Sequence, residues 1–429
     1  MSNYKYTVAE IFCGCGGFSY GFEMQGDFET VLGVDIKPEA LNTFKLNHQS
    51  STIIQKDVRE IEDVEILNIL KDKGVEPYEL DVLIGGPPCQ GFSQMRRSNS
   101  RDKHDVARFT GYSKLAEDKR NDLVLRFLEI AEVLMPKCIV IENVKQVKNH
   151  VLNGREGGFI LSIEEVLEEL GYDVKHSIFN AADYGVPQLR ERAVILASRK
   201  GEVTFPAPTH GQNWVTVGEA IKDLPTPAMK VDSLYKSDLG IYAHEANTDY
   251  LNTMRRGVKW FTANHNTRTY KDDIINLISS MPQGKNWSEV AESKRREYEV
   301  LLQRFPEEER KDAYDRLVED GTIMPAFYKD YYWSAYTRLD PQKPALTITA
   351  NANFLGSGRY THPYENRGIT PREAARLQSF PDRFIFYSSK KGDASTERQG
   401  VIMDMIGEAV PPLLSRAIAQ HIISHELLG

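Results

Sequence analysis

The chain of 429 residues is poor in cysteine, has no long apolar run and carries no excess of positive charge. Its four cysteines are too few for a disulfide framework, which predicts a reducing, cytoplasmic compartment. No run of eighteen apolar residues occurs, so no membrane span is expected. Cys13 and Cys15 lack two further ligands nearby, and we expect no metal site. The net charge of −8 argues against a globally basic nucleic-acid surface but allows a local basic cleft.

One stretch organises the rest of the chain: Gly85-Gly86-Pro87-Pro88-Cys89-Gln90-Gly91-Phe92-Ser93. It follows the apolar run 81–84, which has the length and β-branched character of a strand. Two glycines allow a sharp turn and two prolines then fix the backbone. Chemistry in open α/β sheets sits at the carboxyl ends of strands, so Cys89 is a candidate nucleophile. A buried structural cysteine is the alternative, but such a residue rarely follows Pro-Pro at a strand exit.

The segment after this cysteine is locally basic. Residues 89–120 contain eight Lys or Arg and four Asp or Glu, which gives +4 in an acidic protein. A solvated loop is one explanation. A loop that faces nucleic-acid phosphates is the other, and its place directly after the candidate nucleophile favours it.

The N-terminal part has the pattern of a nucleotide-binding half. A strand is predicted at 8–12, followed by a glycine turn that contains Gly14, Gly16 and Gly17 and then by a helix. Predicted strands at 31–35 and 53–57 end in Asp35 and Asp57. Either acid alone suits a turn, but together with the glycine turn they suggest an adenosine pocket.

Further candidates follow later strands. A helix is predicted at 122–135, and the apolar run 138–141 predicts a buried parallel strand that ends in Glu142. Arg190 and Arg192 lie two residues apart in an extended Gln-x-Arg-x-Arg stretch, so they point to one side. This arrangement suits two adjacent anionic targets, and an ordinary surface pair is the alternative. Capping boxes predict helix starts at Ser162 and Thr370.

These motifs, in this order, resemble the DNA cytosine-5 methyltransferases over residues 8–204 and about 340–425. The resemblance implies S-adenosyl-L-methionine as cofactor, with S-adenosyl-L-homocysteine as product. It implies that Phe12 stacks on the adenine, Asp35 holds the ribose and Asp57 reads the adenine amino group. The full set of implied cofactor residues is Phe12, Gly14, Gly16, Gly17, Asp35, Ile36, Asp57, Val58, Leu123 and Glu408. Glu408 stands where the family usually has Asn, and Asp35 where it more often has Glu.

The same resemblance implies a mechanism. The Cys89 thiolate attacks carbon 6 of a flipped-out cytosine, carbon 5 takes the methyl group, and loss of the carbon 5 proton releases the cysteine. Protonated Glu142 bonds ring nitrogen 3, and Arg190 and Arg192 hold the base carbonyl and a neighbouring phosphate.

The implied fold is a doubly wound, mixed α/β sheet with a second, smaller target-recognition domain. We expect residues 1–204 plus 400–429 to form the catalytic domain and 205–399 the recognition domain. Residues 251–271 contain no acid and interleave basic, aromatic and amide side chains, which suits groove reading as well as it suits an ordinary surface. The predicted DNA-binding residues are Gln90, Ser93, Arg96, Arg97, Arg255, Arg256, Lys259 and Arg268.

Three rival functions remain. A tRNA cytosine-5 methyltransferase is the nearest, although the Cys-Phe-Thr motif of that branch is missing. An inactive DNA-binding relative would not need Cys89 and Glu142, and a nicotinamide dehydrogenase would have other glycine spacing. We expect a monomer that acts on double-stranded DNA in a prokaryotic cytoplasm, associated with the nucleoid when bound to DNA. Family habit predicts a modification role with a separate cognate restriction endonuclease.

Overall fold

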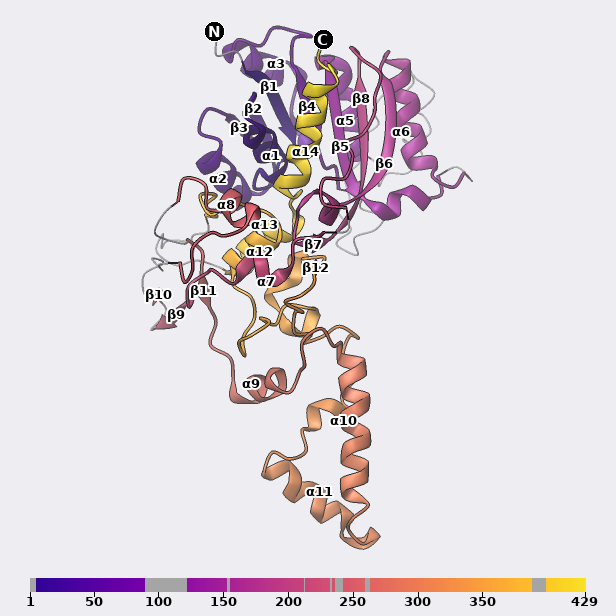
Figure 1. The fold of residues 1–429 in the computed structure, drawn as a ribbon. Helices are drawn as coiled ribbons and strands as arrows, with labels where there is room; N and C mark the ends of the chain where they lie inside the picture. Colours follow the sequence, from indigo (N-terminus) through magenta and orange to yellow (C-terminus); the bar gives the residue numbers. More distant parts are fainter. Residues whose placement is uncertain are drawn as a thin grey trace.

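The computed structural model describes residues 5–88, 122–152, 155–211, 213–231, 234–235, 242–258, 263–387 and 399–429. Its centre is a seven-stranded sheet in the order β3-β2-β1-β4-β5-β8-β6, with helices on both faces (Figure 1). The predicted mixed, doubly wound α/β fold is confirmed. Among the described residues no helix is long and apolar enough to cross a membrane.

The strands are β1 (Tyr6–Ile11), β2 (Phe28–Asp35), β3 (Thr52–Gln55), β4 (Val82–Gly85), β5 (Cys138–Val144), β6 (Asp173–Asn180), β7 (Gln188–Leu189), β8 (Glu191–Ser198), β9 (Ala228–Val231), β10 (Leu234–Tyr235), β11 (Asn266–Thr267) and β12 (Ala345–Leu346). The helices are α1 (Gly17–Gln25), α2 (Pro38–Asn47), α3 (Asp63–Asp72), α5 (Asp122–Leu134), α6 (Gly158–Glu169), α7 (Val217–Ile221), α8 (Asp249–Met254), α9 (Asp272–Ser279), α10 (Trp287–Leu302), α11 (Arg310–Glu319), α12 (Pro371–Leu377), α13 (Gln399–Glu408) and α14 (Pro412–Ser424).

Strand direction determines where the site forms. β3, β2, β1, β4 and β5 run parallel, whereas β8 pairs antiparallel with both β5 and β6. The carboxyl ends of five strands therefore meet at one edge of the sheet. Each of the chemistry-bearing motifs predicted before residue 145 follows one of these ends.

The two faces of the sheet are covered by different helices because successive strand residues point to opposite sides. On one face Val8, Ile84 and Val140 pack against α1 and α14. On the other face Ala9, Leu83 and Ile139 pack against α3, α5 and α6. Figure 1 shows α14, in yellow, lying along α1, so the end of the chain returns to its beginning.

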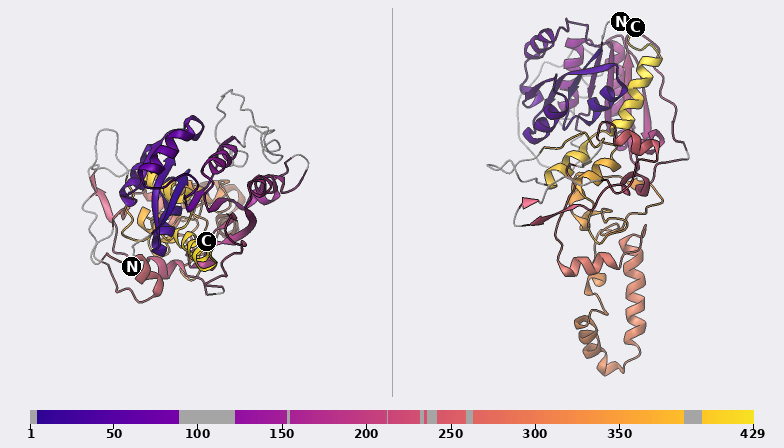
Figure 2. Two further views of the ribbon diagram at one scale, coloured as in Figure 1. Left: turned by 90° about the horizontal axis from the view of Figure 1, so that it is seen from above. Right: turned by 60° about the vertical axis from the view of Figure 1, so that its left-hand side comes forward.

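The second part of the chain, from about residue 205 to 399, has little sheet and supplies most of a large apolar cluster, which Cys15, Tyr20 and Ala40 join from the first part. From it an arm built of α10 and α11 projects away from the body (Figures 1 and 2). At the base of the arm Trp287 stacks on Phe327 with a centroid distance of 5.1 Å and contacts Tyr331 at 5.0 Å. This aromatic packing anchors the arm on the body.

The last two helices, α13 and α14, pack on different parts of the molecule. Ile402 and Ile406 of α13 belong to the apolar cluster of the second part, whereas Leu414 and Ile418 of α14 belong to the sheet side. The division into 1–204 plus 400–429 and 205–399 stays a prediction. The packing shows that α13 ties the two parts together.

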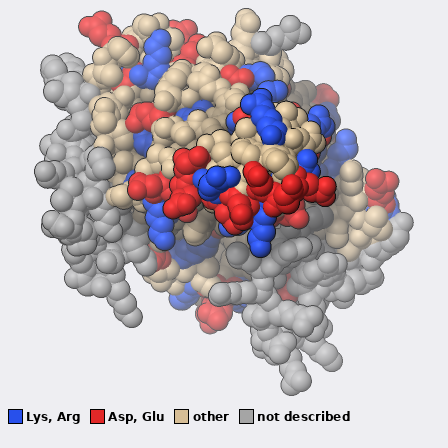
Figure 3. All heavy atoms as spheres, turned by 90° about the horizontal axis from the view of Figure 1, so that it is seen from below, with Lys and Arg blue, Asp and Glu red and all other residues tan. Residues whose placement is uncertain are grey.

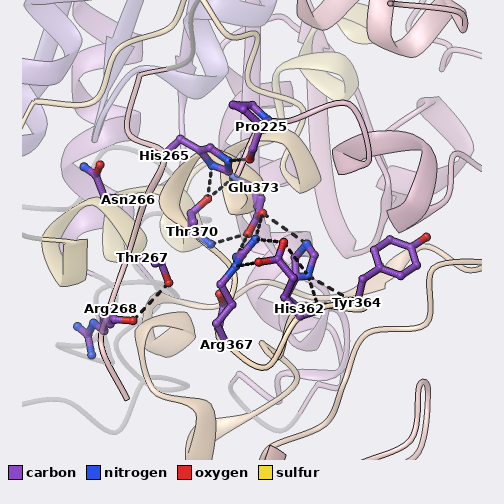
Figure 4. A network of polar contacts seen from close by, with 12 residues as sticks. Pro225, His265, Asn266, Thr267, Arg268, His362, Tyr364, Arg367, Thr370 and Glu373 are labelled. Atoms are coloured by element: carbon purple, nitrogen blue, oxygen red, sulfur yellow. Dashed lines mark hydrogen bonds and ion pairs between the residues drawn. The ribbon is translucent and has the colours of Figure 1, made fainter. Parts of the chain in front are cut away.

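A buried polar cluster stabilises the second part around α12 (Figure 4). The Glu373 carboxylate accepts hydrogen bonds from Arg367 Nη1 and Nη2, both at 2.8 Å, and from the backbone of Thr370 at 2.7 Å. The Arg367 guanidinium, with His362 nearby, outweighs burial and holds the pKa of the Glu373 carboxyl well below its usual range. The predicted capping box at Thr370 is confirmed.

The other predicted capping box is wrong. Helix α6 begins at Gly158 after a left-handed Gly157 and has no side-chain cap. Ser162 is buried within the helix, because apolar residues before it, Phe159 and Ile160, pack on the sheet and extend the helix one turn earlier.

Candidate active site

A pocket of about 700 Å³ opens at the carboxyl edge of the sheet. Of the ten cofactor residues implied by the sequence, nine line it: Phe12, Gly14, Gly17, Asp35, Ile36, Asp57, Val58, Leu123 and Glu408. Glu142, Arg190 and Arg192 line the same pocket, together with Pro87 and Pro88. Residues from five separate strand ends and from the C-terminal helices thus meet in one cavity. Cys89, Gln90, Ser93, Arg96, Arg97 and Lys259 lie outside the described residues.

The glycine turn is shaped for a ligand. Gly14 has φ +51°, a conformation that favours glycine. A methyl group added there would meet no atom within 4 Å, so the space beside Gly14 in the pocket wall is open. The Gly14 N–H donates to Asp35 Oδ2 at 2.8 Å, which fixes the turn on the end of β2. Phe12 also has a positive φ of 61°, a strained backbone typical of functional sites. Gly16 caps the start of α1, and a Cβ atom added there would lie only 2.6 Å from His48 Nε2.

Two carboxylates of the pocket are already paired with cations. Asp57 accepts from Arg59 Nε at 2.9 Å and Nη2 at 2.5 Å, and this pairing lowers the pKa of the Asp57 carboxyl. Glu408 contacts Lys37 Nζ at 2.5 Å across the mouth of the pocket, although the two residues are 371 positions apart. Lys37 therefore offers a countercharge for the carboxylate that replaces the family Asn.

The two strongest motifs meet at the ends of β4 and β5. Glu142 Oε1 lies 2.9 Å from Arg192 Nε, and both side chains are mostly buried. A methyl group added at Gly86 would lie 3.3 Å from Glu142 Oε2, so this carboxylate faces the turn that leads to Cys89. Asn143 Nδ2 donates to Pro87 O at 3.0 Å and holds that turn in place. The sequence did not predict a role for Asn143 in the site. Its position directly after Glu142, at the same strand end, is the signal that could have indicated one.

Arg190 differs from the prediction of a side chain that faces the base or a phosphate. Its Nη1 donates to Ile348 O at 2.9 Å, and its Nη2 donates to Gly407 O at 3.0 Å and to Ala409 O at 3.1 Å. The side chain is buried, and burial lowers the pKa of its guanidinium. The terminal nitrogens of Arg190 therefore hold the chain at Ile348 and the α13–α14 junction against the short link between β7 and β8.

The pocket residues fit an adenosine cofactor with a charged amino-acid end. Phe12, Ile36, Val58 and Leu123 supply apolar surface for a ring system, and Asp35 supplies a carboxylate at the position that suits ribose hydroxyls. Within the described residues no group of three or more His, Cys, Asp or Glu side chains could hold a metal ion.

Comparison with known proteins decides the family. A family model described as C-5 cytosine-specific DNA methylase matches residues 6–424. The chain belongs to this family. Its members methylate carbon 5 of cytosine in DNA, and the chain is a DNA cytosine-5 methyltransferase.

Individual relatives agree with this assignment. The type II methyltransferase M1.HphI of Haemophilus parahaemolyticus is 31% identical over 418 residues, which cover 97% of this chain and 86% of that protein. The type II methyltransferase M.DdeI of Desulfomicrobium norvegicum is 28% identical over 424 residues, covering 97% and 88%. A solved structure of a prophage-encoded DNA modification methyltransferase from E. coli has a TM-score of 0.67 at 22% identity, covering 98% of this chain and 99% of that one, and shares the fold.

The methyltransferase also contains a buried acid that the sequence reasoning did not assign to the site. Glu10 lies in β1 and lines the pocket, and its Oε2 accepts from the Ser19 N–H at 3.2 Å. Burial raises the pKa of its carboxyl to about 8. The folded protein therefore keeps a proton that the unfolded chain releases near pH 4.5.

The difference in the pKa of the Glu10 carboxyl between the folded and unfolded states predicts that the stability of the protein depends on pH. Between pH 4.5 and 8 the folded state binds more protons, so the free energy of unfolding should fall as pH rises, by up to about 1.4 kcal/mol per pH unit. Glu10→Gln, which cannot ionise, should remove that slope and be more stable than the wild type at pH 8 but not at pH 5. Urea unfolding at pH 5, 6.5 and 8 measures this, with the exposed Glu76→Gln as control. Equal slopes for Glu10→Gln and wild type would contradict it.

The basic window 251–271 is partly structural. Arg255 Nη1 donates to His244 O at 2.7 Å, and its guanidinium stacks over the Tyr242 ring at 3.8 Å. Arg268 Nη1 donates to Asn353 O at 3.3 Å. Arg256 is exposed, and its role in DNA binding stays a prediction.

A pair of variants separates these roles. Arg255→Ala should lower the free energy of unfolding by about 1–3 kcal/mol, because it removes charged hydrogen bonds, and should leave the salt dependence of DNA binding unchanged. Arg256→Ala should leave stability unchanged and reduce the salt slope of DNA binding by about one. Thermal unfolding and binding titrations at several salt concentrations measure both. Reversed results would assign DNA contact to Arg255.

Proposed function

We propose that this methyltransferase modifies a cytosine within a specific double-stranded DNA sequence, using S-adenosyl-L-methionine bound in the pocket at the carboxyl edge of the sheet. The observation that carries the proposal is the convergence of Glu142, Arg192 and the Pro87–Pro88 turn in the pocket that also contains the glycine turn and Asp35. The cofactor supplies the methyl group when bound. Phe12, Asp35, Val58 and Leu123 would hold its adenosine, and Glu408 with Lys37 would face its amino-acid end.

Different residues of the chain then act on different atoms of the base. The Cys89 thiolate forms a bond to carbon 6, which increases the electron density at carbon 5. Glu142, in its protonated form, donates a hydrogen bond to ring nitrogen 3 and stabilises the charge that develops there. Arg192 fixes the orientation of the Glu142 side chain. Once carbon 5 has accepted the methyl group, a base removes the carbon 5 proton. The electron pair of that C–H bond restores the 5,6 double bond and breaks the bond between sulfur and carbon 6, which releases the Cys89 thiolate.

The base must leave the duplex to reach this pocket, because a stacked cytosine exposes neither face of its ring. Type II relatives support a modification role in a restriction–modification system, with a cognate endonuclease as a separate protein. We propose that role for this chain. We propose that the chain acts as a monomer.

Competition tests the choice of nucleic acid. Methyl transfer to a plasmid DNA should persist when a large excess of tRNA is present and should fall when unlabelled duplex of the same sequence is added. If tRNA accepts methyl groups and competes as well as the duplex does, the RNA branch of the family is the better assignment.

A further inference from the structure

Exposed aromatic side chains and an arginine lie on two neighbouring segments of the chain, 332–336 and 354–359, outside the predicted window. The segments are joined by the Tyr336 N–H, which donates to Leu355 O at 2.8 Å. Phe354 and Tyr332 are each 60% exposed and Trp333 is 45% exposed. The Arg359 guanidinium stacks on the Trp333 ring at 4.3 Å, and among the described residues Arg359 has no carboxylate partner. Large aromatic side chains usually lie buried, so an exposed group of this size points to a partner.

This cluster is joined directly to the active-site pocket. β12 pairs with β7, and Ile348 O accepts from Arg190 in the pocket wall. Thr349 and Ala350, which follow Ile348, pack on Gly407. A methyl group added at Gly407 would lie 2.4 Å from the Ala350 nitrogen. The 3-10 helix η7 (Ala350–Asn353) leads from there to Phe354. A rise of about 2 Å per residue places Phe354 roughly 8 Å along the chain from the pocket wall, a distance of a few base-pair steps.

The backbone that carries Phe354 is held firmly. Ser357 Oγ donates to Asn351 O at 2.7 Å and to Phe354 O at 2.6 Å, and the Phe354 N–H donates to Asn351 O at 3.0 Å. Arg268 Nη1 also donates to Asn353 O at 3.3 Å. The exposed ring therefore sits on a preorganised turn rather than on a loose loop, which lowers the entropy cost of inserting it into a partner.

Charge identifies the kind of partner. Residues 341–364 contain no Asp or Glu, and this acid-free stretch is longer than the predicted window 251–271. Carboxylates gather instead at the lower end of the molecule (Figure 3), where the link between α10 and α11 contains Glu307, Glu308 and Glu309. The stretch 341–364 itself therefore contributes no negative charge that would repel a polyanion, and it carries the cations Lys343 and Arg359.

We infer that Phe354 and the Trp333–Arg359 pair form the surface that enters the target duplex beside the flipped cytosine. Phe354 inserts between base steps and occupies the space that the flipped base leaves, as apolar wedges do in other DNA-binding proteins. Arg359, held by Trp333, contacts the DNA beside the inserted ring. This inference rests on the proposed function, because it requires a duplex substrate from which a base is flipped.

The experiment compares two duplexes that contain the recognised sequence, which bisulfite sequencing provides. One is fully matched, and the other has an abasic site opposite the target cytosine, so that little energy is needed to open it. Phe354→Ala should lower the single-turnover methylation rate by about 10- to 100-fold on the matched duplex and by less than about 3-fold on the abasic one. Arg359→Ala should weaken binding of both duplexes equally and lower the salt slope by about one.

Matched controls make the result decisive. Tyr364→Ala removes another exposed aromatic ring from the same acid-free stretch, and it should leave both rates unchanged. Phe354→Leu should keep most of the rate, and calorimetric titration with S-adenosyl-L-methionine should give unchanged affinity for every variant. The inference is overturned if Phe354→Ala behaves like Tyr364→Ala, or if it slows both duplexes alike. If Phe354→Ala does not bind the cofactor, the methylation rates of Phe354→Leu and Tyr364→Ala on the matched duplex are compared instead. Equal rates for these two variants would then overturn the inference. A wild-type protein that methylates no duplex at all would contradict the proposed function itself.

Discussion

Replacement of Cys89 by serine should abolish both methyl transfer and covalent trapping. In the presence of S-adenosyl-L-methionine, DNA in which the target is 5-fluorocytosine should bind the wild-type protein irreversibly, because after methyl transfer fluorine cannot leave carbon 5 as a proton does. The sulfur–carbon 6 bond then persists and survives denaturing electrophoresis. Serine is a far weaker nucleophile at neutral pH, so Cys89→Ser should give no trapped band and no measurable turnover.

The other cysteines provide the control for this experiment. Cys138 is buried in β5, and burial raises the pKa of its thiol well above the usual range, which makes it inert. Cys138→Ala should therefore still be trapped. Cofactor affinity should be near normal in Cys89→Ser. A Cys89→Ser protein that methylates at the wild-type rate would eliminate the covalent mechanism.

Replacement of Glu142 by glutamine should slow chemistry far more than binding. Glutamine keeps a hydrogen-bond donor beside Arg192 but cannot deliver a proton, so we expect a loss of single-turnover rate of about 10²- to 10⁴-fold, the scale of general acid catalysis. The affinities for DNA and for the cofactor should change little. Rapid-quench measurement with enzyme in excess over DNA isolates this step.

A neighbouring acid serves as the matched control. Glu191 also lies beside Arg192 but is half exposed and pairs with Lys145 at the surface. Glu191→Gln should leave the single-turnover rate unchanged. If Glu142→Gln and Glu191→Gln have the same rate, Glu142 has only a structural part in the site.

The sheet and the pocket could be predicted because the signals were local. Each strand before residue 145 was a short apolar run, and each site residue came directly after one, so parallel strand direction was enough to bring Asp35, Asp57 and Glu142 to one edge. The capping box at Thr370 was equally local and was confirmed. Local patterns failed at Ser162, where packing of earlier apolar residues extended the helix.

Contacts between distant residues could not be predicted. The carbonyls that bind Arg190 belong to Ile348, Gly407 and Ala409, and no pattern in the sequence links them to it. The ion pair between Lys37 and Glu408 is of the same kind. The basic window 251–271 misled in part because composition does not show that Arg255 stacks on Tyr242. The stretch 341–364 contains few charged residues, so its composition predicts no DNA-binding surface. Only the fold shows that its rings, such as Phe354, are exposed.

The central claim is that this chain methylates carbon 5 of a cytosine in DNA at the pocket containing Glu142 and reached by Cys89. Bisulfite sequencing of DNA from bacterial cells that lack their own cytosine methylation, and that express either the wild type or Cys89→Ser, tests it most directly. We predict that wild-type cells show protected cytosines at one position of a single short sequence and that Cys89→Ser cells show none. Fully converted DNA from cells with folded wild-type protein, or equal protection in both strains, would contradict the account.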